Sequence, residues 1–212
     1  MGAVRGRYAL LLQECLKGAL AGYVGLDAKP HAQWDEYRAR PGIELICADA
    51  GATKRYRAAA DLIFTQSALE TFVNDIEFFM QIATHVSSTN RPTLQLHLVP
   101  SGACLATFRW HGVRQYTPRT ISRITRLSGP ETSRYLYYLG SAACNRVHRR
   151  YIIYPCLFGL RDRRERDLDT CERDLRQAVQ DDEAGTSDEA CFHALVLQAR
   201  VQRDIFAAPR TG

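Results

Sequence analysis

The sequence predicts an α+β fold, with antiparallel hairpins and packed helices in the N-terminal half and a mostly helical C-terminal half. Two observations support this prediction. Short apolar runs bounded by turn residues lie before residue 112, and apolar residues spaced three and four apart dominate after residue 117. The 212 residues are 46% hydrophobic and 24% charged, which is enough for one core of normal size. We expect residues 1–164 to form an α+β domain with a basic helical segment, and residues 165–212 to form an acidic helical extension packed on the same domain.

The N-terminal half alternates helices with pairs of strands. Apolar residues at helical spacing predict a first helix over residues 8–23. The apolar run 43–48 predicts a strand that pairs with residues 55–64 as a hairpin. A serine followed three residues later by a glutamate is the pattern of a capping box, and it predicts a helix over residues 68–86. Residues 93–112 alternate apolar and polar side chains about a Pro-Ser-Gly turn, which predicts a second hairpin.

The C-terminal half reads as a series of helices. A short helix is predicted over residues 118–127, and a second capping box with proline in its first turn predicts another over 130–150. The apolar, β-branched residues 151–160 are compatible with a strand. Acid and arginine pairs three and four apart predict a charged helix over 161–182. A last amphipathic helix is expected within 183–206.

The charge is distributed unevenly along the chain. The net charge is +5, but residues 108–166 hold thirteen arginines against three carboxylates, whereas residues 167–212 hold ten carboxylates against five arginines. This asymmetry indicates an anionic partner. Alternatively, the acidic segment folds over the basic one and neutralises it. All but three of the 28 positive side chains are arginine, which suits phosphate binding, although a GC-rich coding sequence would give the same bias.

Residues 120–139 resemble a winged helix-turn-helix. Apolar residues and the small Thr125 precede Gly129 by four residues, and a capped segment follows. In that family a small residue lets the second helix pack closely, and a glycine makes the turn. The resemblance implies that the second helix reads nucleic acid and that residues 151–160 form part of a wing. The tyrosines of this segment make its second helix bulkier than most reading helices.

A binding surface is also predicted without that motif. Two arginine triplets, each spaced for one helical face, are interleaved with tyrosines, and such side chains can contact phosphates and stack on bases. The predicted nucleic-acid-binding residues are Arg119, Arg123, Arg126, Arg134, Tyr137, Tyr138, Arg146, Arg149 and Arg150.

These features predict a non-catalytic, nucleic-acid-associated regulatory protein that binds through its arginine- and tyrosine-rich segment. The alternative is an adaptor or structural subunit of a protein assembly, of the viral accessory kind, whose basic segment docks an acidic partner. Phosphate binding would weaken steeply with salt, whereas docking through an apolar surface would not. The predicted partners are therefore nucleic acid or an acidic protein surface, and the oligomeric state is left open.

No catalytic, metal or cofactor site is predicted. Cys144 and His148 have the spacing of half a zinc site, but no second half follows at zinc-finger spacing. Cys156 lies between arginine clusters that could activate a thiol, although a buried small side chain is the simpler interpretation. No nucleophile elbow, phosphate-binding loop or dinucleotide-binding glycine pattern occurs. An enzyme with a reactive Cys156 is therefore only the third hypothesis.

The cysteines predict the compartment. Seven cysteines at wide spacing, without a CxxC pair, argue against a secreted disulfide framework and predict an intracellular location, nuclear or cytoplasmic. The apolar run at residues 8–12 is followed by polar and charged side chains, so it is too short for a signal peptide or a membrane span. We expect no contact with a membrane.

Overall fold

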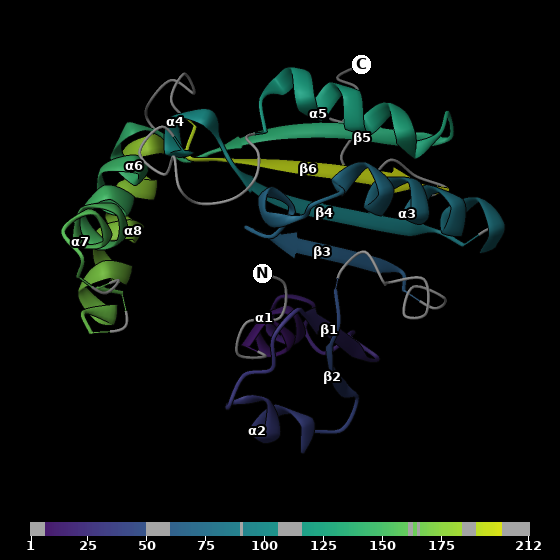
Figure 1. Ribbon diagram of the computed structural model, residues 1–212, viewed down its shortest axis with the longest axis horizontal. Helices are drawn as coiled ribbons and strands as arrows, with labels where there is room; N and C mark the ends of the chain where they lie inside the picture. Colours follow the sequence, from purple (N-terminus) through teal and green to yellow (C-terminus); the bar gives the residue numbers. More distant parts are fainter. Residues whose placement is uncertain are drawn as a thin grey trace.

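The protein contains two separate sheets and a block of helices (Figure 1). The computed structural model describes residues 7–49, 60–89, 91–105, 116–160, 163–164, 166–183 and 190–200. Among these residues, no helix combines the length and the apolar character that are needed to cross a membrane.

The larger sheet has four strands in the order β3-β4-β6-β5. They are β3 (Leu62–Gln66), β4 (Thr93–Pro100), β5 (Thr132–Leu139) and β6 (Phe192–Ala199). β3 and β4 run parallel, whereas β6 runs antiparallel to both β4 and β5. The 15-residue helix α3 (Asp75–Thr89) connects β3 to β4, as a parallel pair requires. The α+β prediction with antiparallel hairpins is therefore wrong, and the sheet is the mixed sheet of an α/β fold.

The smaller sheet consists of β1 (Tyr23–Asp27) and β2 (Ile43–Cys47), which are also parallel. Helix α2 (Trp34–Arg38) lies between them in the chain, and α1 (Arg7–Cys15) precedes them. The strand predicted at 43–48 is confirmed as β2, which pairs with β1; of its predicted partner, residues 55–59 lie outside the described residues and residues 62–64 pair with β4. The first helix ends earlier than predicted, because the backbone turns into the left-handed region at Lys17 and Gly18. Tyr8 of α1 contacts the ring of Phe64 in β3, with 5.6 Å between ring centroids.

Helices α3 and α5 (Pro118–Thr125) pack on the four-stranded sheet and enclose its core (Figure 1). α5 was predicted, and Thr117 caps it by accepting a hydrogen bond from the Thr120 N–H at 3.2 Å. α3 begins later than predicted, since residues 69–71 form the 3-10 turn η3 (Leu69–Thr71). Asn74 caps the helix instead: its Oδ1 accepts a hydrogen bond from the Glu77 N–H at 3.1 Å.

A helical block follows β5 and occupies one end of the larger sheet, at the left in Figure 1. It contains α6 (Ala142–His148), the π-helical turn η5 (Arg149–Ile153), α7 (Tyr154–Leu157) and α8 (Leu168–Glu183). The charged helix was predicted and is confirmed as α8. The helix predicted over 130–150 is wrong in its first half, which forms β5. Residues 151–160 were compatible with a strand, but residues 151–157 are helical.

The last predicted helix is also wrong. Residues 192–199 form β6, which lies between β4 and β5 and is buried over almost its whole length. A strand buried on both faces is apolar at consecutive positions, so its sequence does not alternate. Such a run cannot be distinguished from a buried helical segment by periodicity.

Candidate functional site

The predicted nucleic-acid-binding residues are spread over several elements. Arg119 and Arg123 are exposed on α5, and Arg126 begins the 3-10 turn η4 (Arg126–Ser128). Arg134, Tyr137 and Tyr138 lie on β5, Arg146 on α6, and Arg149 and Arg150 on η5. The segment predicted as a reading helix is thus a strand. The two arginine triplets lie on separate elements, one over α5 and η4 and the other over α6 and η5.

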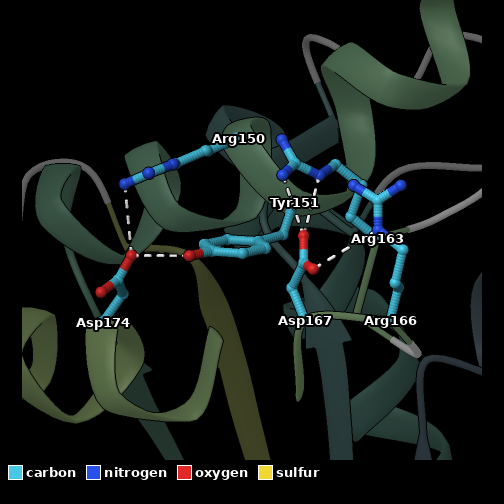
Figure 2. Close-up of polar contacts among 6 residues, drawn as sticks. All are labelled: Arg150, Tyr151, Arg163, Arg166, Asp167 and Asp174. Atoms are coloured by element: carbon cyan, nitrogen blue, oxygen red, sulfur yellow. Dashed lines mark hydrogen bonds and ion pairs between the residues drawn. The ribbon is translucent and has the colours of Figure 1, made fainter. Parts of the chain in front are cut away.

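Some of these arginines make hydrogen bonds or ion pairs with other residues of the chain. Arg134 donates to the backbone carbonyl of Thr125 at 2.8 Å and to that of Gly129, which joins the end of α5 to β5. Figure 2 shows Arg150 beside Asp174 of α8, with 3.3 Å between Nη1 and Oδ2. The Tyr151 hydroxyl donates to the same carboxylate oxygen at 2.8 Å.

The acidic segment neutralises part of the basic one. Asp167 accepts hydrogen bonds from Arg163 and Arg166, with Arg163 Nη2 at 2.9 Å from its Oδ2 (Figure 2). Asp182 of α8 accepts a hydrogen bond from the Ser141 N–H before α6. Contact of the basic segment with nucleic acid or an acidic protein surface stays a prediction.

The carboxyl end of each parallel pair of strands is a second place where a site can lie. Ligands of open α/β sheets bind outside these ends, at the point where strand order changes. The last residues of the four parallel strands are Asp27, Cys47, Gln66 and Pro100. The charged member of this set is Asp27 at the end of β1.

Asp27 is buried, with 8% of its surface exposed. Its Oδ1 accepts a hydrogen bond from the Lys29 backbone N–H at 3.2 Å. Its Oδ2 lies 3.4 Å from His31 Nε2, yet neither atom makes a hydrogen bond with the described residues. Buried carboxylate oxygens are normally hydrogen-bonded, because removal from water is otherwise unfavourable. Asp27 Oδ2 can therefore accept a hydrogen bond from a ligand.

Helix α2 holds the side chains beside Asp27 in place. The His31 ring lies 5.8 Å from the ring of Trp34, which is almost completely buried. The Arg38 guanidinium lies over Trp34, 5.1 Å from its ring centroid, and donates to the Leu45 carbonyl at 2.8 Å. These contacts connect α2 to β2 beside Asp27.

A group of sulfur and imidazole side chains lies beyond the carboxyl end of β4. Cys104 is in α4 (Gly102–Leu105), His148 ends α6, and Cys191 directly precedes β6. One ligand atom of each lies within 4.8 Å of the others. Hydrogen bonding from the Cys191 thiol is the main influence that lowers the pKa of Cys104, and His148 and Arg149 act in the same direction against the effect of burial. The same pairing raises the pKa of Cys191.

Glu70 lies close to this group. It is buried in η3, and its Oε2 makes no hydrogen bond with the described residues. Burial is the largest influence on its pKa and raises it, and negative charge at Cys104 contributes in the same direction. The carboxyl of Glu70 is therefore within electrostatic reach of Cys104.

Sequence reasoning missed most of these residues. It identified Cys144 with His148 as half a zinc site, whereas the structure joins His148 to Cys104 and Cys191. Cys156, interpreted as a buried side chain, is exposed on α7. The signal for Asp27 is a short β-type run that ends on an acid, directly after the residues predicted as the first helix.

Comparison with known proteins identifies the fold. No family model and no curated protein matches the chain. The structure of the plantazolicin methyltransferase BamL with a triazolic desmethylPZN analogue and SAH is 12% identical, covers 93% of this chain and 74% of its own, and has a TM-score of 0.55. For the plantazolicin methyltransferase BpumL with SAH, the identity is 12%, the coverages are 93% and 73%, and the TM-score is 0.54. For the 4+2 cyclase SpnF, the identity is 13%, the coverages are 94% and 73%, and the TM-score is 0.61.

These similarities correct the earlier interpretation. The chain has the Rossmann-like α/β fold of these structures, and the winged helix-turn-helix resemblance is wrong, because its second helix is β5. The hypothesis of a non-catalytic nucleic-acid regulator, and the adaptor or viral accessory alternative, are overturned with it, since the similar structures are methyltransferases and a cyclase. At 12–13% identity the likeness concerns the fold alone.

Proposed function

We propose that this protein is a methyltransferase that takes its methyl group from S-adenosylmethionine. The observation that carries the proposal is the buried Asp27 carboxylate at the end of β1, in a fold shared with methyltransferases whose structures were described with SAH. SAH is S-adenosylhomocysteine, the product that remains when S-adenosylmethionine has given up its methyl group.

The residues around Asp27 fit an adenosyl group. In nucleotide-binding α/β folds, an acid at the end of a strand accepts hydrogen bonds from ribose hydroxyls. Asp27 has one carboxylate oxygen without a hydrogen bond to the described residues, and His31 lies beside it. Asp49 follows β2 by two residues and provides a second acid after the neighbouring strand. When bound, the sulfonium of S-adenosylmethionine would supply an activated methyl group, and Asp27 would bind and orient the ribose.

An intracellular location, nuclear or cytoplasmic, is part of the same proposal. It is supported by the seven cysteines, which all lie among the described residues and form no disulfide there.

The test is binding of SAH to the folded protein. The chain has two tryptophans, so a Trp110→Phe variant retains Trp34, which is buried beside His31, as a fluorescence reporter. We expect a saturable fluorescence change with SAH. The substitution Asp27→Asn should weaken binding by about 10-fold or more, because hydrogen bonds to charged groups are worth about 1.5–3 kcal/mol.

Asp35→Asn is the matched control. Asp35 lies on α2 near the same site, but its side chain is 92% exposed, so the affinity for SAH should not change. Calorimetry on the unsubstituted protein provides a second measurement that does not depend on Trp34. Failure of the folded protein to bind SAH or S-adenosylmethionine would refute the proposal, as would unchanged affinity in Asp27→Asn.

A further inference from the structure

We propose that Cys104, His148 and Cys191 form a zinc-binding site that joins three segments of the chain at the carboxyl end of β4. The three residues are distant in the sequence and come from α4, α6 and the position directly before β6. The inference is independent of the proposed methyl transfer, because it rests on side chains outside the Asp27 site.

The spacing of the ligand atoms suits a tetrahedral metal ion. The two sulfur atoms and one ring nitrogen lie within 4.8 Å of one another. Zn²⁺ bonds of about 2.3 Å to sulfur and about 2.0–2.1 Å to nitrogen place tetrahedral ligand atoms roughly 3.5–3.8 Å apart. Small side-chain adjustments therefore suffice to close the group around an ion.

The backbone around the two cysteines is fixed by hydrogen bonds between neighbouring segments. The Ser101 N–H donates to the Cys191 carbonyl at 3.0 Å, and the Cys104 N–H donates to Ser101 Oγ at 3.2 Å. The Cys191 N–H donates to the Leu139 carbonyl at 2.9 Å, which joins the end of β5 to the start of β6. The positions of the two cysteines are thus set by the sheet.

Close packing also restrains α6 against this site. Gly140 has φ 68°, and a Cβ atom added there would lie 2.9 Å from Cys144 Cβ and 3.2 Å from Cys191 Cβ. The chain can enter α6 this close to Cys191 because residue 140 is glycine. This entry places α6, and with it His148 at the end of the helix, beside the two cysteines.

The ligand set selects zinc over the common hard cations. Two cysteine sulfurs and an imidazole are typical zinc ligands, whereas Mg²⁺ and Ca²⁺ prefer oxygen. Both cysteines are buried and His148 is half-buried, so bulk water has little access. Three protein ligands leave a fourth coordination position open. A bound ion would hold the helical block against the larger sheet.

The first experiment uses the unsubstituted full chain, reduced and freed of metal with a chelator. Co²⁺ should give the visible bands of tetrahedral coordination together with thiolate-to-cobalt charge transfer in the near ultraviolet. Zn²⁺ should displace Co²⁺ at one equivalent, and Mg²⁺ should not. Zn²⁺ should also raise the melting temperature, because an ion that binds only the folded state stabilises it.

Substitutions assign the ligands. Cys104→Ala, Cys191→Ala and His148→Gln should each lower zinc affinity by more than about 100-fold, since even outer-shell partners contribute about 10- to 100-fold. Cys156→Ala, at the exposed cysteine of α7, should bind zinc normally. Cys144→Ala removes a buried cysteine of the same cluster that is outside the proposed ligand set, and it should also retain binding. His148→Gln keeps the experiment decisive if the buried cysteine variants do not fold.

Three outcomes would overturn the inference. Reduced, folded protein without a tetrahedral Co²⁺ spectrum would show that the group does not bind such an ion. Binding that survives all three ligand substitutions, or that is lost equally in Cys144→Ala, would assign the ion elsewhere. A reduced protein that binds no zinc but forms a Cys104–Cys191 disulfide on oxidation would show a thiol pair instead of a metal site. Each of these results leaves the SAH experiment unaffected.

Discussion

The two sheets of this protein contain the same unit, a parallel pair of strands joined by a helix, but the two units are built on very different scales. In the smaller unit the connecting helix α2 has five residues and buries Trp34. In the larger unit α3 has fifteen residues, and its apolar face packs into the main core with β4, β6 and α5. The first unit therefore depends on few buried side chains, whereas the second is supported by the main hydrophobic core.

This difference matches the division of roles that we propose. The smaller unit keeps the Asp27 carboxylate buried with one oxygen that makes no hydrogen bond to the described residues, which lowers stability but suits ligand binding. In the larger unit the buried His97 and Asp75 side chains make hydrogen bonds, although Glu70, His193 and Gln198 also have buried atoms without a hydrogen bond to the described residues. Ligand-binding segments of proteins are commonly drawn from the less stable regions of the fold.

Removal of one core leucine from each sheet should give the largest contrast. Leu197 of β6 is completely buried, and Leu197→Ala should lower the free energy of unfolding by about 2–5 kcal/mol. Leu45→Ala in β2 should mainly destabilise β1 and β2 and leave the global free energy of unfolding less affected, because a two-stranded sheet is only marginally stable by itself. Urea unfolding measures the first effect, and amide hydrogen exchange in β1 and β2 measures the second. Equal losses of global stability in both variants would show that the two sheets unfold as one unit.

Acid should destabilise the larger unit through His97. This ring is completely buried, and burial lowers its pKa from 6.5 to about 3. Its Nδ1 is 2.9 Å from Thr65 Oγ1 and its Nε2 is 3.3 Å from Gln95 Oε1, so one neutral tautomer satisfies both contacts. The rings of Phe78 and Phe79 cover it and carry no charge.

The unfolded chain binds a proton at this histidine below about pH 6.5, whereas the folded chain does so only near pH 3. The contribution of His97 is therefore fully present above pH 6.5 and declines as the pH falls, by roughly 3 kcal/mol at pH 4. Unfolding in urea between pH 4 and pH 8 tests this. The free energy of unfolding should depend less on pH in His97→Gln than in the original protein, and the dependence should persist in His85→Gln. An unchanged pH dependence in His97→Gln would contradict the assignment to this residue.

A smaller effect is expected from the buried hydroxyl of Tyr116. It lies 2.6 Å from Asp75 Oδ2 and 3.2 Å from the Leu69 carbonyl, so it connects α5 to the start of α3. Tyr116→Phe should lower the free energy of unfolding by about 1–3 kcal/mol, because a buried carboxylate loses a donor. The control is Tyr154→Phe at a half-exposed tyrosine, which should remain within about 0.5 kcal/mol of the original protein in the same urea experiment.

The smallest effect is expected at the surface of the larger unit. Arg91 Nη2 and Asp61 Oδ1 are 2.7 Å apart, and both side chains are largely exposed. Arg91→Ala should lower the free energy of unfolding by about 0–1 kcal/mol, and the difference should shrink as salt is raised. A salt-independent loss larger than that of Tyr116→Phe would mean that this pair has a structural role comparable to the buried contacts.

Local signals in the sequence predicted those elements whose chemistry is local. The short helix predicted over residues 118–127 is confirmed as α5, and acid–arginine spacing correctly indicated α8. The strand at β2 was predicted from a short apolar run. The pairing of the strands could not be predicted in the same way, because an isolated run of apolar residues does not specify its partner or whether the pair is parallel.

The candidate sites show the same limit. Asp27 was visible only as one acid in a polar stretch, since its burial depends on α2 and β2 packing around it. The basic segment was identified correctly as a charge pattern, but its residues fold into a helix, a strand and a helical block. Arg134 and Arg150 are partly used in internal contacts there.

By itself the sequence determined the charge asymmetry and the helices α5 and α8, whose signals are near neighbours in the chain. Only the tertiary structure decided which strands pair, that residues 192–199 enter the centre of a sheet, and that Cys104 and Cys191 meet His148. The physical reason is the separation along the chain over which each interaction acts. Capping and helical periodicity act over three or four residues, whereas strand pairing and ligand clusters depend on backbone contacts between segments that are distant in the chain.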